Sequence, residues 1–109
     1  MIVISSNAPT PPPAVPVWTF LSNHGRVVLC IARDPTIRLR DIGEQVGITE
    51  RAAHRIVSEL ADAGYVTRER HGRRNHYAIR DDLPLPDGMA RTQTVGDLVN
   101  LLADRAPAA

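Results

Sequence analysis

Basic side chains gather late in the middle of the chain, where they can bind anions. Residues 65–80 hold five arginines and two histidines against one acid, Glu69. Arginines at this density suit a segment laid along a nucleic-acid backbone or dipping into its minor groove. The alternative is a solvated strand edge that its charges keep from aggregating. Arg38 and Arg40, at the start of an earlier predicted helix, are further candidates for phosphate contact, although one of them can simply point to solvent. The side chains assigned to phosphate contact in residues 65–80 are Arg68, Arg70, Arg73 and Arg74.

Polar residues also recur with helical spacing just before that stretch. They lie opposite the apolar stripe of a predicted helix, so they face outward as a group. Arg51 can form two parallel hydrogen bonds to guanine, whereas Arg55 and Ser58 lie further along and suit phosphates. In the alternative, Arg55 pairs with Glu59 one turn later and the face is only solvated. The candidate contacts to nucleic acid on this helix are Thr49, Glu50, Arg51, His54, Arg55 and Ser58.

Three helices are predicted ahead of the basic stretch, over residues 23–33, 39–46 and about 50–63. Ser22 and Thr49 are suitable N-caps for the first and third of them. Gly47 and Gly64 suit the position just after a helix, where a left-handed backbone favours glycine. Apolar residues at spacings of three and four give the first and third helices a face to bury.

The apolar pattern changes from helical to alternating beyond the third helix. Residues 65–80 contain β-forming residues on either side of Gly72, which predicts a β-hairpin. Residues 82–88 contain two prolines and are predicted to form a loop. Thr94 can then cap a last helix, whose wide apolar stripe lies within residues 95–102.

Two short helices joined by a glycine-containing turn and followed by a hairpin are the elements of a winged helix-turn-helix. This motif needs a small residue where its helices cross, a glycine in the turn and apolar residues at fixed offsets. Gly43 supplies the small residue and Gly47 supplies the turn. The apolar offsets are filled by Ile42, Val46, Ile48, Ala53 and Ile56. The predicted fold class is therefore mainly α, with a β-hairpin wing, a three-helix core and a C-terminal helix.

On these motifs the chain resembles small MarR-type and ArsR-type winged-helix transcriptional regulators. The resemblance covers roughly residues 18–80 and is carried by Leu39-Arg40-Asp41-Ile42, Gly47-Ile48-Thr49-Glu50-Arg51 and Ala63-Gly64-Tyr65-Val66. It implies that the third helix enters the major groove of DNA. Two departures from the pattern count against metal sensing and against a large ligand pocket. The ligand sets of metal-sensing ArsR-type proteins have no counterpart, and the long flanking helices of MarR-type proteins are reduced to one short helix.

Composition excludes several other classes of protein. A chain of 109 residues with 43% apolar and 23% charged residues forms one small domain. The single cysteine, Cys30, rules out an internal disulfide and a paired-cysteine zinc site, and we expect it to be a small buried side chain. The histidines show no ligand spacing and no catalytic motif is evident, so we expect no metal, no cofactor and no enzyme activity. No apolar run suits a membrane helix and the first residues do not resemble a signal peptide, so we expect a cytoplasmic protein.

The chain is predicted to divide into three parts. Residues 1–17 are a proline-rich flexible arm, residues 18–80 the DNA-binding domain, and residues 81–109 a loop with a dimerisation helix. Two recognition helices usually meet half-sites about 34 Å apart, which favours a homodimer. The alternative is that the last helix folds over the first helix of its own chain. The side chains assigned to dimerisation are Trp18, Phe20, Val95, Leu98, Val99 and Leu102.

The predicted function is sequence-specific binding of double-stranded DNA by a homodimeric transcription regulator that recognises an inverted repeat. The sequence identifies no small-molecule effector. The alternative is a winged-helix module that binds a protein or RNA without reading DNA, because a fold alone does not define a function. That alternative gains if Glu50, Glu59 and Glu69 interrupt the positive face formed by the arginines.

Overall fold

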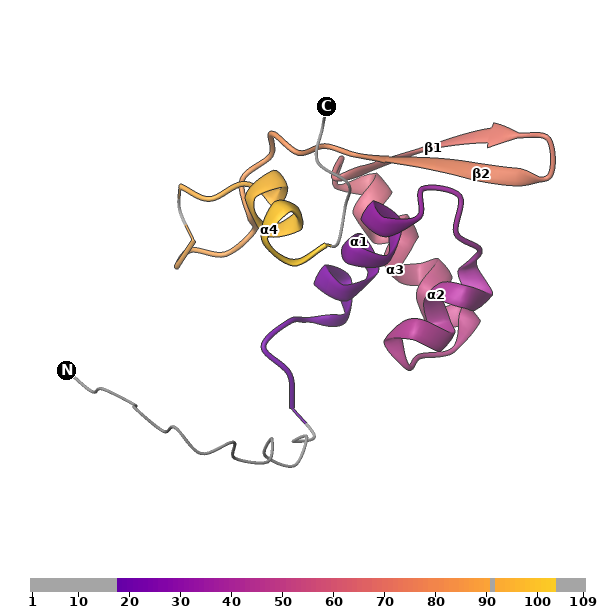
Figure 1. The fold of residues 1–109 in the computed structure, drawn as a ribbon, viewed down its shortest axis with the longest axis horizontal. Coiled ribbons are helices and arrows are strands. Elements are labelled where there is room, and N and C mark those ends of the chain that lie inside the picture. The colour runs from indigo at the N-terminus through magenta and orange to yellow at the C-terminus, as the bar shows by residue number, and fades with distance from the viewer. Residues whose placement is uncertain (1–17, 91, 104–109) are drawn as a thin grey trace, which may run out of the picture.

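Four helices and one hairpin make up residues 18–90 and 92–103, which are the residues that this computed structural model describes. The elements are α1 (Asn23–Arg33), α2 (Leu39–Val46), α3 (Glu50–Asp62), β1 (Val66–His71), β2 (Arg74–Ile79) and α4 (Val95–Leu102). Figure 1 shows the hairpin extending away from the helices, with α4 on the other side of α1. The fold is a winged helix-turn-helix followed by a C-terminal helix. The helices match their predicted bounds to within a residue, and the arm predicted for residues 1–17 lies outside the described residues.

Local signals in the sequence begin and end the helices. The Ser22 hydroxyl accepts a hydrogen bond from the Gly25 amide at 3.1 Å, and the Thr49 hydroxyl accepts one from the Ala52 amide at 3.0 Å. Each cap satisfies an amide that the first turn of its helix leaves without a partner. Gly47 ends α2 with a φ of 86°, a left-handed conformation that glycine adopts without a steric penalty.

The helix-turn-helix is closed by a near contact at Gly43. A Cβ atom on this residue would lie 2.7 Å from the carbonyl oxygen of Ile48, so only glycine fits without a shift of backbone. The carbonyl of Gly43 in turn accepts hydrogen bonds from the amides of Gly47 at 2.8 Å and Ile48 at 2.9 Å. The turn is therefore folded tightly onto α2, and this sets the position at which α3 begins.

The hydrophobic core is centred on α1, which is buried along most of its length. The helices α2, α3 and α4 and the strand β2 pack against α1, and β1 joins the core through α3. Burying each aliphatic side chain contributes roughly 1.5–3 kcal/mol. The largest side chains with almost no exposure are Ile31, Ile42, Ile56, Val27, Val57, Val66 and Val99. Because α3 contributes its whole apolar face to this core, its opposite face must point outward.

The hairpin is anchored at its base and exposed at its tip. Val66 pairs with Ile79 at the base, and Val66 and Tyr77 are buried. The Tyr77 amide also donates a hydrogen bond to the carbonyl of Pro35 at 2.9 Å, which ties β2 to the segment between α1 and α2. The other residues of β1 are exposed, so the hairpin projects as the predicted wing.

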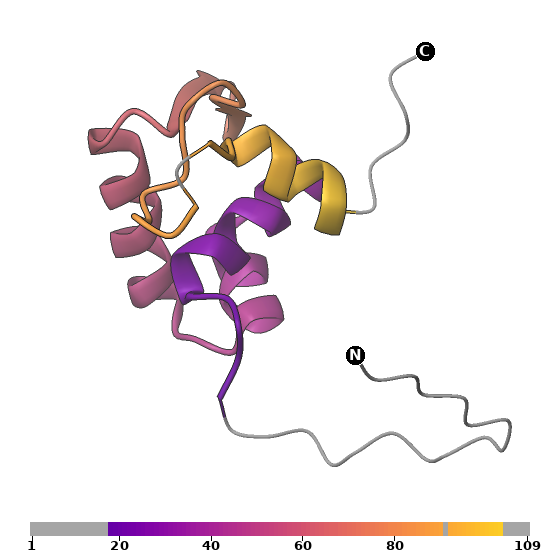
Figure 2. The same ribbon diagram turned by 90° about the vertical axis from the view of Figure 1, so that its left-hand side faces the viewer.

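The segment after the hairpin folds back and places α4 across α1 (Figure 2). The amide of Gly96 donates to the carbonyl of Asp81 at 2.9 Å, and a Cβ atom on Gly96 would lie only 3.0 Å from Asp81. Val95 and Val99 are buried in the core of their own chain. The prediction that these two side chains contact a second copy is therefore corrected, because a side chain that is already buried has no surface left for a partner.

Candidate nucleic-acid interface

The third helix presents a polar face to solvent. Its buried side chains are Ala53, Ile56, Val57 and Leu60. The residues between them were predicted to face outward, and in the structure Glu50, Arg51, His54 and Arg55 are exposed and Ser58 is half-buried. Within the described residues, the side chains of Arg51, His54 and Arg55 take part in no hydrogen bond or ion pair, so their polar groups are open to a ligand. Their contact with nucleic acid stays a prediction.

A groove of about 490 Å³ lies between the start of α2, the start of α3 and the tip of the hairpin. Arg38 and Arg40 line it from α2, and Arg73 and Arg74 line it from the wing. We call it the arginine groove. The fold brings together two pairs of arginines that lie far apart in the sequence and were assigned separately. Their combined charge attracts phosphate groups.

Two of the residues that line the arginine groove without having been assigned from the sequence lie on the wing. They are Asn75 and Tyr77 on β2. The Asn75 amide donates to the Tyr77 hydroxyl at 3.5 Å, so the two side chains lie together on one face of the strand. Alternate residues of a strand share a face, and this spacing could have identified them once the hairpin was predicted.

Three acidic side chains were expected to decide whether the positive surface is continuous. Glu50 lines the arginine groove, where four arginines outnumber it. Glu69 lies on the wing and is 3.3 Å from a histidine of the same strand. Glu59 is hydrogen bonded to His24 of α1 at 2.7 Å rather than to Arg55, so the alternative pair does not form between these described residues. Two acids therefore lie within the positive surface and one lies outside it.

Two of the predicted contact residues also stabilise the elements that carry them. Thr49 uses its hydroxyl to cap α3. Arg70 donates from Nε to the carbonyl of Gly72 at 3.1 Å, which holds the turn of the hairpin. Arg68, Arg73 and Arg74 are exposed, and no hydrogen bond of this kind occupies them within the described part of the chain. The wing therefore presents three guanidinium groups whose donors are open to phosphate.

A metal centre, a membrane-spanning helix and a reactive thiol find no support in residues 18–90 and 92–103. No group of three or more histidine, cysteine, aspartate or glutamate side chains in those ranges could hold a metal ion. No helix within the same ranges is long and apolar enough to span a bilayer. Cys30 is buried, and burial raises the pKa of its thiol. A protonated, buried thiol is a poor nucleophile.

Residues 21–67 match the model of a family described as winged helix-turn-helix DNA-binding. The match spans α1 to α3 and ends at the start of β1, so the wing tip and α4 lie beyond it. No curated protein matches the chain. The fold is that of a winged helix-turn-helix, and the matched segment is similar to a DNA-binding family of this class, which is typically not enzymatic; the match suggests a regulator of transcription. The narrower likeness to MarR-type and ArsR-type regulators stays a prediction.

Proposed function

We propose that this chain is a cytoplasmic transcription regulator that binds double-stranded DNA sequence-specifically, as a homodimer on an inverted repeat. The observation that carries the proposal is the position of the arginine groove beside the exposed face of α3. A helix that enters the major groove needs phosphate contacts on both sides of its entry point. Here arginines of α2 and of the wing line one groove together with Glu50 at the start of α3, which supports such contacts.

The residues divide into two roles under this proposal. Arg51 and His54, near the start of α3, read base edges, and Arg51 is suited to the two acceptors of guanine. Arg55 and Ser58 lie further along the helix and contact phosphates. The arginines assigned to the backbone on either side are Arg38, Arg40, Arg68, Arg70, Arg73 and Arg74.

Exposed apolar side chains away from the wing tip support the homodimer. Phe20 is 93% exposed, Trp18 is 61% exposed and Leu101 is 79% exposed. The rings of Trp18 and Phe20 pack edge to face with their centroids 5.3 Å apart, so they form one aromatic surface. Apolar surface of this kind marks an interface, and twofold pairing would present two copies of α3 to the two half-sites. Leu98 and Leu102 of α4 keep some exposure and complete the proposed surface.

Fluorescence anisotropy with labelled duplexes tests the proposal. We expect salt-dependent binding to random DNA and tighter binding to a duplex selected from a random pool. Arg51→Ala should narrow the difference between the two duplexes. Arg80→Ala is the control, because it removes the same charge but its guanidinium already lies 3.2 Å from Asp82. Equal losses on both duplexes for Arg51→Ala would contradict its role in base reading. No binding even at low salt would favour a protein-interaction module.

A further inference from the structure

A second hollow lies between α1, α3, α4 and the segment that joins β2 to α4. Its volume is about 550 Å³, within the range of small-molecule sites. It lies apart from the arginine groove, and the two share no residue. We call it the apolar pocket. The lack of long flanking helices in the sequence argued against a large ligand pocket, but Leu85, Pro86, Asp87 and Ala90, between β2 and α4, form one wall of this hollow.

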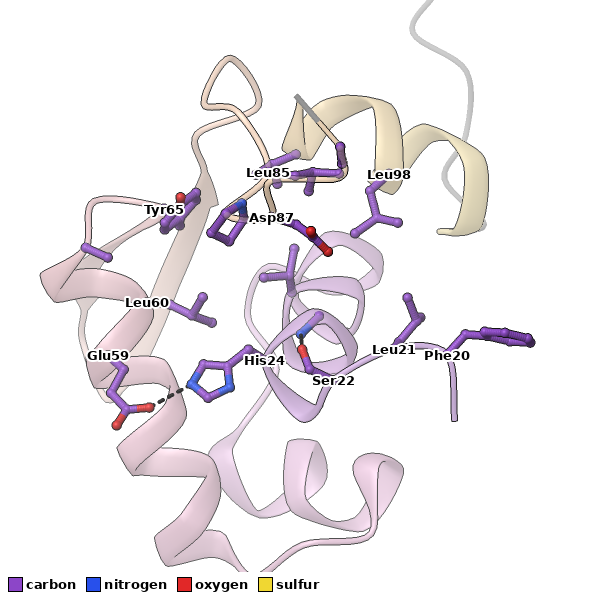
Figure 3. Close-up of a pocket in the computed structure, with 16 residues that line it drawn as sticks. Phe20, Leu21, Ser22, His24, Glu59, Leu60, Tyr65, Leu85, Asp87 and Leu98 are labelled. Atoms are coloured by element: carbon purple, nitrogen blue, oxygen red, sulfur yellow. Dashed lines mark hydrogen bonds and ion pairs between the residues drawn. The ribbon is translucent and has the colours of Figure 1, made fainter. Parts of the chain in front are cut away.

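The walls of the apolar pocket come from elements that are distant in the sequence. Leu60 of α3, Leu85 of the loop and Leu98 of α4 point into the same space in Figure 3. Val28 of α1 and the ring of Tyr65 extend this apolar lining. Leu85 is held in place because its amide donates to the carbonyl of Gln93 at 3.0 Å. A ligand with an apolar body would therefore meet a wall fixed by backbone hydrogen bonds.

Two carboxylates stand at opposite edges of the apolar pocket. Glu59 comes from α3 and Asp87 comes from the loop (Figure 3). Glu59 uses Oε1 for its 2.7 Å contact with His24, and Asp87 uses Oδ1 to accept from the Met89 amide at 2.9 Å. Within the described residues the second oxygen of each carboxylate has no such partner. Two acids therefore meet one histidine in the described lining, and that histidine, His24, is already paired with Glu59, so the edges favour a cation over an anion.

We propose that the apolar pocket binds a small organic cation, with an apolar body among Leu60, Leu85 and Leu98 and a protonated amine at Glu59 or Asp87. Volume, lining and charge together define this ligand class, because an apolar amine matches the walls and the edges at once. A second copy of the chain borders the pocket in the proposed homodimer, because Phe20 and Leu98 belong to both surfaces, and it is the competing occupant. It would have to place an apolar side chain here and leave both carboxylates unmatched.

Binding of phenylbutylamine to the full chain, measured by isothermal titration calorimetry and by amide chemical shifts in NMR spectra, tests the proposal. Phenylbutyrate has nearly the same shape and the opposite charge, and butylamine lacks the ring. We expect phenylbutylamine to bind at least roughly fivefold more tightly than phenylbutyrate, since the carboxylates attract one and repel the other. The shifts should centre on Val28, Leu60 and Leu98. Equal binding of the two charged probes, or equal binding of butylamine, would overturn the proposal.

Exchange of the edge carboxylates identifies where the amine binds. Glu59→Gln and Asp87→Asn keep the size of each side chain and remove its charge, and at least one should weaken amine binding roughly two- to fivefold. Asp62→Asn is the matched control, because Asp62 is an exposed acid of α3 outside the pocket. Unchanged affinity in both edge variants would refute the proposal. None of these measurements uses DNA, so their failure and that of the proposed function are distinguishable.

Discussion

Removal of the two arginines at the wing tip should change how DNA affinity depends on salt. Arg73 and Arg74 are exposed and line the arginine groove, and neither is occupied by a hydrogen bond or ion pair within the described residues. Each guanidinium that meets a phosphate releases condensed counterions, and each lost contact lowers the slope of log affinity against log salt by about 0.9. The proposed homodimer carries two wings, so the variant Arg73→Ala/Arg74→Ala loses four contacts and should have a slope shallower by about 3.6.

This change in slope predicts how much less DNA affinity the variant loses than the parent when the salt concentration is raised. A fourfold rise in salt, from about 50 to about 200 mM, changes log salt by about 0.6, so the difference in log affinity between variant and parent is about 0.6 times the slope difference. Over that range the homodimeric variant should lose about 150-fold less affinity than the parent protein. The effect should be the same on random and selected duplexes, because phosphate contacts carry no sequence information.

Anisotropy titrations at four or more salt concentrations, on both duplexes, measure the slope directly. Arg80→Ala is the control for loss of charge alone, since Arg80 is already paired with Asp82. Equal slopes of log affinity against log salt for the wing variant and the parent would refute the proposal that the wing contacts phosphates. A large loss confined to the selected duplex would refute it as well, because it would mean that the wing tip reads bases.

Other predictions follow from packing and from ionisation. Gly43→Ala should destabilise the fold by about 1–2 kcal/mol despite a gain of about 1 kcal/mol in helix propensity, because its Cβ meets a carbonyl oxygen at 2.7 Å. Thermal unfolding measures the effect, with the substitution Gln45→Ala at an exposed position of the same helix as the control. Equal stability of the two variants would contradict the close contact at Gly43. The hydrogen bond from Arg80 lowers the pKa of Asp82, so the pair stabilises the fold above the pKa of the unfolded carboxyl and the contribution is lost as pH falls through the lowered value. Asp82→Asn should remove that part of the acid dependence in denaturant titrations, and an unchanged pH profile would show that the pair contributes nothing. Burial raises the pKa of the Cys30 thiol, so a neutral alkylating reagent should modify the native chain far more slowly than the unfolded chain, and equal rates would show that the thiol is accessible.

The helix bounds could be predicted because their signals are local. Ser22 and Thr49 cap the helices that follow them, and Gly47 ends α2, through contacts within four residues. The small residue at Gly43 was also predictable, since the helix-turn-helix imposes it at a fixed distance from the turn. The orientation of the polar face of α3 followed from periodicity alone.

The remaining features depend on contacts between distant segments, which periodicity does not define. The wide apolar stripe of α4 indicated that the helix packs against another surface, but it did not identify that surface. Val95 and Val99 were therefore assigned to contact with a second copy of the chain. The arginine groove requires the wing to return beside α2, which the hydrogen bond between Tyr77 and Pro35 achieves. The pair formed by His24 and Glu59 joins residues 35 positions apart, and no local pattern indicates it.

The two proposed sites occupy different parts of the same helix. Arg51 lies near the start of α3 and Glu59 lies eight residues later, which is about 12 Å along the helix axis. The first faces the solvent beside the arginine groove, and the second pairs with α1 at the edge of the apolar pocket. Because one rigid element carries both, a ligand that moved α3 relative to α1 would also move the side chains that face DNA. Because the arginine groove and the apolar pocket share no residue, a substitution in one leaves the contacts of the other intact, and only the proposed dimer surface shares Phe20 and Leu98 with the pocket lining.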